Sequence, residues 1–181
     1  MSDPLEVHVR VLLHPGGPNG DFHFETTDLP MGPGNVLYFN NHGHPGFLVH
    51  YDLQDPTHGY LFPEAALFPP SPPKQNLRQA LFSHGQTGCP TAVGQWGQFT
   101  AEDVTNSGKT LVVWNKNQTQ HDFGYTLRVT NDRGATYLPL DPGGVNQNGS
   151  RSFSTTTAVA AIGGAVAGSL ITLGAQALLQ G

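Results

Sequence analysis

Apolar and polar residues alternate along the first segment of the chain, residues 5–13 (LEVHVRVLL). The odd positions are apolar from Leu5 to Leu13, whereas Glu6, His8 and Arg10 fall on even positions. Successive side chains of a β-strand point to opposite faces of its sheet, so a period of two residues is typical of a strand. This segment is therefore predicted to be a strand with one face in the core and the other in water.

Short apolar runs bounded by turn residues predict further strands downstream. We expect them at residues 22–25, 35–40, 46–55, 110–117, 123–131 and 135–140. The run at 46–55 (GFLVHYDLQD) alternates but carries some apolar character on both faces, which suits a strand at the centre of a sandwich. The polar stretch from Asn115 to Asp122 is predicted to be a hairpin loop.

About seven such strands, with no strand–helix–strand alternation, favour an all-β domain over a parallel α/β sheet. Their spacing predicts an antiparallel, immunoglobulin-like or cupredoxin-like β-sandwich over residues 1–140. The high content of glycine (23) and proline (15) agrees with many short strands and turns. Proline interrupts every apolar run between residues 54 and 96, so we expect a Pro-rich loop excursion there, with one short helix in NLRQALFS.

The end of the chain has a different character. Every Asp, Glu, Lys and Arg lies at or before Arg151. The run from Ala158 to Leu179 would span a hydrocarbon core of about 30 Å as a helix, at about 1.5 Å per residue. On such a helix, large and small side chains segregate to different faces: Ile162, Val166 and Leu170 share one face, and Ala160, Gly164, Gly168 and Thr172 form a stripe of small residues on another.

The small stripe contains Gly164 and Gly168 at the spacing that lets two helix backbones approach closely. Residues 152–181 are therefore predicted to form a hydrophobic glycine-zipper helix, and residues 141–151 a glycine-rich linker before it. Few of its residues are large and apolar, and no Trp or Tyr anchors either end. Three alternatives stay open: a membrane helix, a helix buried in a homo-oligomer, and a locally packed or flexible tail.

Charge and cysteine content narrow the classes of partner. A net charge of −5 with only 8 Lys and Arg leaves no basic patch for phosphates, so we expect no nucleic-acid partner. Cys89 is the only cysteine, which rules out an intrachain disulfide. The N-terminal MSDPLEVHV has no apolar signal-peptide core, so we expect cytoplasmic synthesis, with membrane association only through the C-terminal segment.

Nine histidines raise the question of a metal site. His42, His44 and His50 lie close in sequence and are the weak candidates for metal ligands, although surface or hydrogen-bonded histidines are the commoner interpretation. A blue-copper site is not expected, because Cys89 lacks a nearby downstream His. We predict no resident cofactor.

No motif indicates catalysis. Ser83 and Cys89 lack the neighbours of an activated nucleophile, so no catalytic residue is predicted, although a hydrolase built from loops stays open. Trp96 and Trp114 are potential ligand platforms, with core packing of Trp114 as the ordinary explanation.

Two functional hypotheses follow. The first is a non-enzymatic β-sandwich module that self-associates through its C-terminal helix, either tethered to a lipid membrane or as the subunit of a structural homo-oligomer, with membrane perturbation as a sharper variant. The second is a soluble ligand- or metal-binding sandwich, in which the excursion from residue 54 to 96 frames a pocket.

Overall fold

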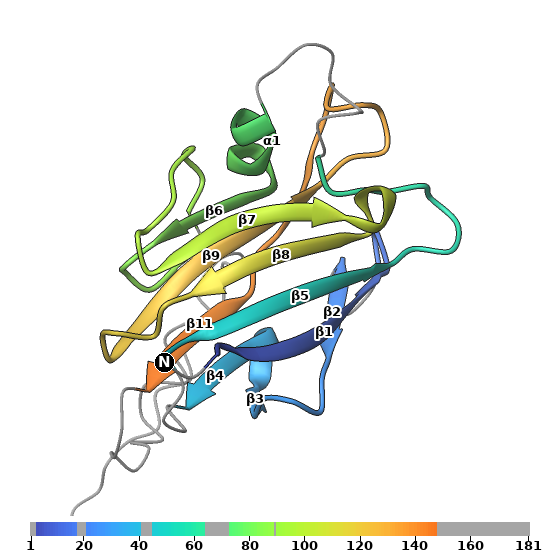
Figure 1. Ribbon diagram of the computed structural model, residues 1–181. Coiled ribbons are helices and arrows are strands. Elements are labelled where there is room, and N and C mark those ends of the chain that lie inside the picture. Colours follow the sequence, from blue (N-terminus) through green and yellow to red (C-terminus); the bar gives the residue numbers. More distant parts are fainter. Residues whose placement is uncertain (1–2, 18–20, 41–44, 64–72, 89, 148–181) are drawn as a thin grey trace, which may run out of the picture.

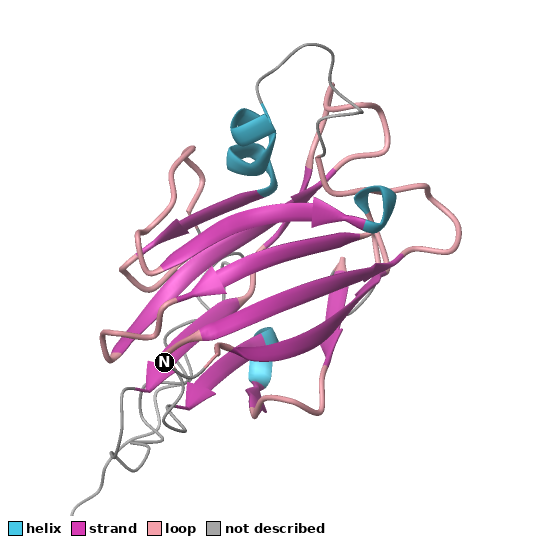
Figure 2. Cartoon of the chain, in the orientation of Figure 1, coloured by secondary structure: helices cyan, strands magenta, loops and turns pink. Residues whose placement is uncertain are grey.

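The computed structural model describes residues 3–17, 21–40, 45–63, 73–88 and 90–147. The described elements are mostly strands, with one α-helix and two short 3₁₀ turns, so the prediction of an all-β fold is confirmed (Figure 2). The strands form two curled sheets that enclose one core (Figure 1).

The first sheet, sheet A, has five strands. Their order is β2 (Phe22–Glu25), β1 (Leu5–Leu13), β5 (Phe47–Gln54), β8 (Thr110–Asn115) and β7 (Phe99–Thr105). The alternation read from LEVHVRVLL is confirmed, because Val7, Val9 and Val11 are fully buried while the even positions face outward. β5 lies at the centre of the sheet, as its pattern predicted.

The second sheet, sheet B, has six strands. Five follow the order β10 (Leu138–Leu140), β9 (His121–Val129), β11 (Gly143–Gln147), β4 (Val36–Asn40) and β3 (Met31–Gly32). The sixth, β6 (Leu81–His84), pairs with residues 124–127 of β9. The helix α1 (Pro73–Ala80) directly precedes β6, so the segment NLRQALFS is half helix and half strand. Two short 3₁₀ turns, Pro33–Asn35 and Asn106–Gly108, complete the described elements.

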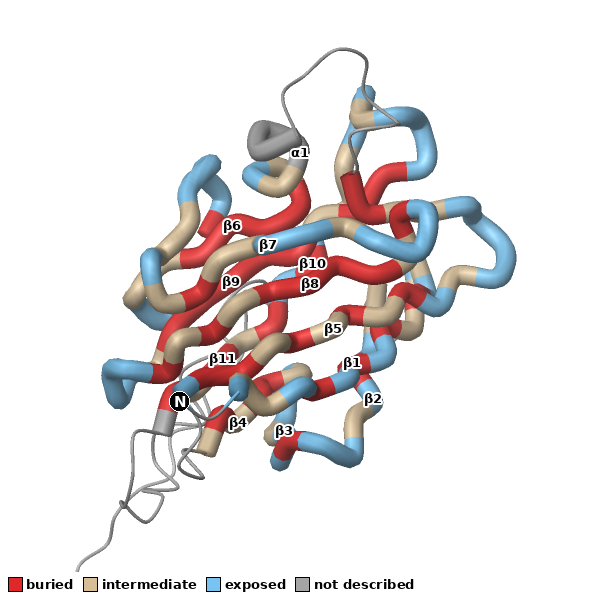
Figure 3. The backbone as a smooth tube through the Cα atoms, viewed as in Figure 1, coloured by how far each residue is buried: buried red, intermediate tan, exposed pale blue. Residues whose placement is uncertain are grey.

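Large apolar side chains from both sheets meet between them. Figure 3 shows that buried positions recur along the strands of both sheets. Phe39, Phe99, Phe123 and Tyr125 form a continuous aromatic cluster, with ring centroids 4.7 to 6.2 Å apart. Tyr51 of sheet A donates a hydrogen bond of 2.9 Å to the Tyr125 hydroxyl of sheet B. Burial raises the pKa of the Tyr51 hydroxyl, so this group stays a neutral donor in the core.

Two features of the sheets differ from the sequence-based prediction. The sheets are mixed rather than purely antiparallel, because β1 pairs with β5, and β4 with β11, in parallel. The stretch from Asn115 to Asp122 is not a hairpin loop: β8 pairs with β5 and β7, whereas β9 pairs with strands of sheet B. A short polar loop suits a crossing between sheets as well as a hairpin, so its composition could not separate the two.

Part of the predicted linker, residues 141–151, is a strand. β11 lies between β9 and β4, so the β domain extends to at least Gln147. Because this strand contains two glycines, the sequence has no apolar alternation there. Gly144 is needed for packing: a Cβ on Gly144 would lie 2.4 Å from an atom of the Phe123 ring. The absence of a side chain on Gly144 lets the Phe123 ring of β9 lie close to the β11 backbone.

The Pro-rich excursion is packed more tightly than its composition suggests. Its described large apolar side chains Phe62, Leu81 and Phe82 are buried. The strands β6 and β7 were not predicted, because β6 spans only four residues and β7 (FTAEDVT) carries charges on its exposed face.

The predicted C-terminal zipper helix at 152–181 lies outside the described residues. Among the residues that are described, no helix has both the length and the apolar character needed to span a membrane.

The turn after β9 gives a stability prediction. The Asp132 carboxylate accepts hydrogen bonds from the Thr136 hydroxyl (2.5 Å), the Thr136 amide (2.9 Å) and the Thr130 hydroxyl (2.8 Å). These bonds lower the pKa of Asp132 from 3.8 to about 2. A depressed folded-state pKa adds stability above the unfolded value, and this stability is lost as the pH falls from about 4 to about 2.

We therefore expect Asp132→Asn to lower the melting temperature at pH 7, with a smaller difference from the native protein near pH 2. Thermal unfolding followed by circular dichroism across this pH range measures the effect. Asp103→Asn, at an exposed position of β7, is the control. An equal loss at both pH values would show that the Asp132 charge contributes nothing.

Candidate metal centre

The candidate centre lies on the outer face of sheet A, where β1 and β5 run side by side. The wet face of β1 carries Glu6 and His8, and the parallel register places His8 directly opposite His50. Val7 and Val49, one position away on the two strands, are fully buried on the inner face. The same alternation that builds the core therefore brings these three polar side chains together outside it.

Glu6, His8 and His50 offer one carboxylate oxygen and two imidazole nitrogens that all lie within 4.8 Å of one another. The His8 and His50 rings are stacked, with centroids 4.6 Å apart and planes inclined by 16°. His8 is 57% exposed, whereas the Nε2 atom of His50 is buried and makes no hydrogen bond. A buried polar atom without a hydrogen-bond partner destabilises the folded state by about 1 to 3 kcal/mol. A ligand bound to this nitrogen would remove that cost.

Hydrogen bonds hold His8 from both sides. Its Nδ1 lies 3.1 Å from Oδ2 of Asp52, the next outward residue after His50 on β5. Its backbone amide donates to Oδ2 of Asp28 (2.8 Å), and its carbonyl accepts from the Thr26 hydroxyl (2.7 Å). The loop after β2 thus fixes the position of the His8 backbone.

Two imidazoles and a carboxylate suit zinc and the other divalent transition metals better than Mg²⁺ or Ca²⁺, which prefer oxygen ligands. Donors around a tetrahedral zinc ion lie about 3.4 Å apart, given metal–nitrogen distances of about 2.0 to 2.1 Å. The stacked rings must rotate to converge on one ion, because imidazole lone pairs lie in the ring plane. The second side-chain torsion of histidine has broad minima, so a ring can turn about it without leaving its rotamer.

Of the three histidines predicted from sequence, the described part of the chain contains only His50. His50 belongs to the cluster, whereas His42 and His44 lie outside the described residues. Glu6 and His8 were missed as ligands, although their Glu-x-His spacing on one strand face was visible. The missing information was the pairing of β1 with β5, which joins residues more than 40 positions apart.

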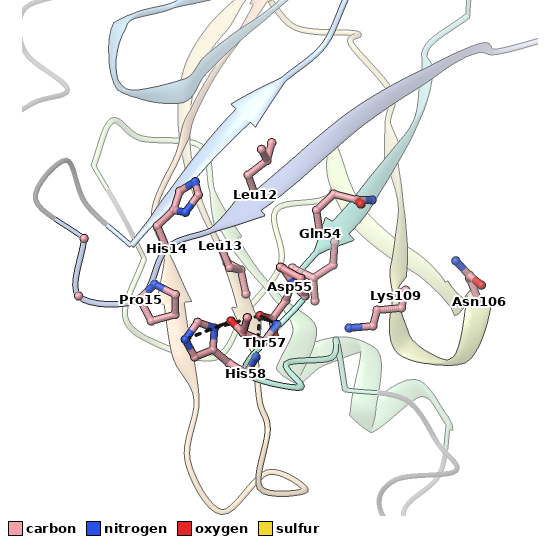
Figure 4. Close-up of a pocket in the computed structure, with 14 residues that line it drawn as sticks. Leu12, Leu13, His14, Pro15, Gln54, Asp55, Thr57, His58, Asn106 and Lys109 are labelled. Atoms are coloured by element: carbon pink, nitrogen blue, oxygen red, sulfur yellow. Dashed lines mark hydrogen bonds and ion pairs between the residues drawn. The ribbon is translucent and has the colours of Figure 1, made fainter.

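A separate pocket of about 790 Å³ lies at the end of sheet A where β1 and β5 terminate (Figure 4). Figure 4 shows Asp55, Thr57 and His58 gathered on one side, with the Lys109 side chain extending toward them. The excursion contributes Asp55 to His58 to the lining, but His50 is not among the lining residues.

The Asp55, Thr57 and His58 group does not have the geometry of a catalytic triad. The Thr57 hydroxyl (2.8 Å) and Asp55 Oδ1 (3.0 Å) both approach Nδ1 of His58, whereas a triad uses the two ring nitrogens separately. Burial raises the pKa of Asp55, but hydrogen bonds from the amides of Tyr60, His58 and Thr57 and from the His58 side chain outweigh it and lower the pKa. Asp55 acts as the anchor of this turn.

The other candidates have structural contacts. The buried Ser83 hydroxyl donates to the Phe99 carbonyl (2.7 Å) and accepts from the Trp96 amide (2.8 Å), so it ties β6 to β7. Trp96 packs against the Phe123 ring at the core edge. Trp114 points outward from β8 and is half-buried, contrary to the expectation of core packing. Cys89 lies outside the described residues.

Comparison of the sequence with models of known protein families and with curated proteins finds no match.

Proposed function

We propose that the domain binds a divalent transition-metal ion through Glu6, His8 and His50. The observation that carries this proposal is the convergence of the three donors within 4.8 Å on paired strands, together with a buried Nε2 atom on His50 that has no hydrogen-bond partner. The proposal belongs to the metal-binding hypothesis drawn from the sequence, with two of its three ligands replaced.

The charges around the cluster support a cation. Glu6 and Asp52 place two carboxylates beside the imidazoles, and the neighbouring Arg10 forms its ion pair with Glu25 at 2.7 Å. The arginine is thus held toward the β2 side, away from the donors. An ion bound here would link β1 to β5 by side chains as well as by backbone hydrogen bonds.

We also propose that the fold is closer to the cupredoxin-like than to the immunoglobulin-like alternative. Immunoglobulin sandwiches consist of two antiparallel sheets. Here each sheet contains a parallel pair, β1 with β5 and β4 with β11. The donor set nevertheless differs from that of a blue-copper protein, because it contains no thiolate.

Zinc titration tests the metal site. We expect the native protein to bind Zn²⁺ at one equivalent and His50→Ala, His8→Ala and Glu6→Gln each to weaken binding at least about tenfold, because each removes one of three ligands. Isothermal titration calorimetry measures affinity, and the melting temperature should rise with zinc as RT ln(1 + [L]/Kd).

His23→Ala, an exposed histidine of the adjacent strand β2, is the matched control and should bind zinc like the native protein. The double variant His42→Ala/His44→Ala tests the ligands predicted from sequence alone. Loss of zinc binding in that variant, with unchanged binding in His8→Ala and Glu6→Gln, would overturn the assignment.

A second candidate function rests on the charge-free segment 152–181. We propose that it makes the protein self-associate through the small stripe at Ala160, Gly164, Gly168 and Thr172, with the face of Ile162, Val166 and Leu170 toward lipid or the rest of the assembly. An uncharged segment with glycines spaced by four residues is typical of closely packed helix pairs. Membrane tethering or perturbation is the more specific form of this proposal.

Replacing both Gly164 and Gly168 with Ile tests close helix packing. The variant keeps the segment apolar but blocks backbone approach, so we expect a smaller assembly in sedimentation velocity and unchanged or stronger flotation with liposomes. Replacing Leu170 and Leu173 with Ile in the same segment is the control. Unchanged assembly size in the glycine variant would contradict the zipper.

A further inference from the structure

We propose that Asp52 is the positioning residue of the metal centre, and this inference rests on the proposed function. Asp52 holds His8 in the tautomer that is protonated on Nδ1, which leaves the Nε2 lone pair for the ion. Nδ1 of His8 lies 3.1 Å from Oδ2 of Asp52. An ionised carboxylate only accepts hydrogen bonds, so the nitrogen facing it must carry the proton.

Both oxygens of Asp52 are already engaged. Oδ1 accepts a hydrogen bond of 2.8 Å from the hydroxyl of Thr110, a buried residue of β8, while Oδ2 faces His8. The register places Thr110 directly opposite Asp52 on the neighbouring strand. Thr110 of β8 therefore orients Asp52, and Asp52 in turn orients His8 of β1. Asp52 supports a metal ligand and is not itself a ligand.

The arrangement joins three adjacent strands in one chain of contacts. Thr110 on β8 orients Asp52 on β5, Asp52 orients His8 on β1, and His8 stacks on His50 of β5. Carboxylate partners of this kind fix the tautomer and ring orientation of metal-binding histidines. Their removal weakens metal binding by about 10- to 100-fold in known sites.

The experiment compares the full-length native protein with Asp52→Asn. Long-range ¹H–¹⁵N NMR on ¹⁵N-histidine-labelled, zinc-free protein reports which nitrogen of neutral His8 is protonated. We expect the Nδ1–H tautomer in the native protein. In Asp52→Asn, the amide can donate to Nδ1, so we expect a shift toward the Nε2–H tautomer and a zinc affinity lower by about 10- to 100-fold.

Asp103→Asn, at an exposed position of β7 in the same sheet, is the matched control and should change neither the tautomer nor the affinity. Thr110→Val removes only the bond to Oδ1 and should cause a smaller loss of zinc affinity than Asp52→Asn. A merely structural role of Asp52 would lower stability without moving the His8 tautomer.

The outcomes separate the two proposals. An Nε2–H tautomer in the native protein overturns the positioning role even where Asp52→Asn does not fold. A native tautomer and affinity in folded Asp52→Asn overturn it as well. Absence of zinc binding by native protein with the expected tautomer overturns the proposed function instead, because the tautomer is measured without metal.

Discussion

The parallel register between β1 and β5 is the constraint on which the core and the candidate site both depend. It sets Val7 against Val49 on the inner face and His8 against His50 on the outer face. Because successive side chains alternate, a slip by one residue would exchange the two faces of β1. The valines of β1 would then face water, and Glu6, His8 and Arg10 would face the core. Burial of the valines therefore keeps Glu6 and His8 on the outer face, next to His50.

A backbone contact holds this register where β1 and β5 begin. The Leu5 amide donates to the Gly46 carbonyl at 3.0 Å, where a Cβ on Gly46 would lie only 2.6 Å from the Asn115 carbonyl oxygen. Glycine is thus required by close approach of the β8 end. Farther along, Thr26 and Asp28 bind the backbone of His8. The chain between β1 and β5 contributes strands to both sheets, so no tight turn enforces their pairing, and the contact between Leu5 and Gly46 helps to fix it.

The sequence predicted most of this fold where the signal was local. The alternation in β1 and β5 located both strands and both faces, because burial on one side imposes a period of two. The pairing of these strands could not be predicted, because it depends on contacts distant in sequence. β11 was mistaken for a linker for another reason: Gly144 contributes space for Phe123, and buried Asn146 contributes a 2.7 Å bond from Asn115, so neither adds to an apolar pattern.

The candidate site could be predicted only in part, because its residues lie on strands that are distant in sequence. His50 was selected because of its neighbours in sequence, yet the described partners lie on another strand. Adjacent strands are about 4.8 Å apart, so opposite outward residues bring their side chains close to the spacing that a chelated ion needs. Residues on this face are not required to fill the core. Metal ligands can therefore occupy outward positions of β1 and β5 while Val7, Val9, Val49 and Tyr51 stabilise the fold beneath them.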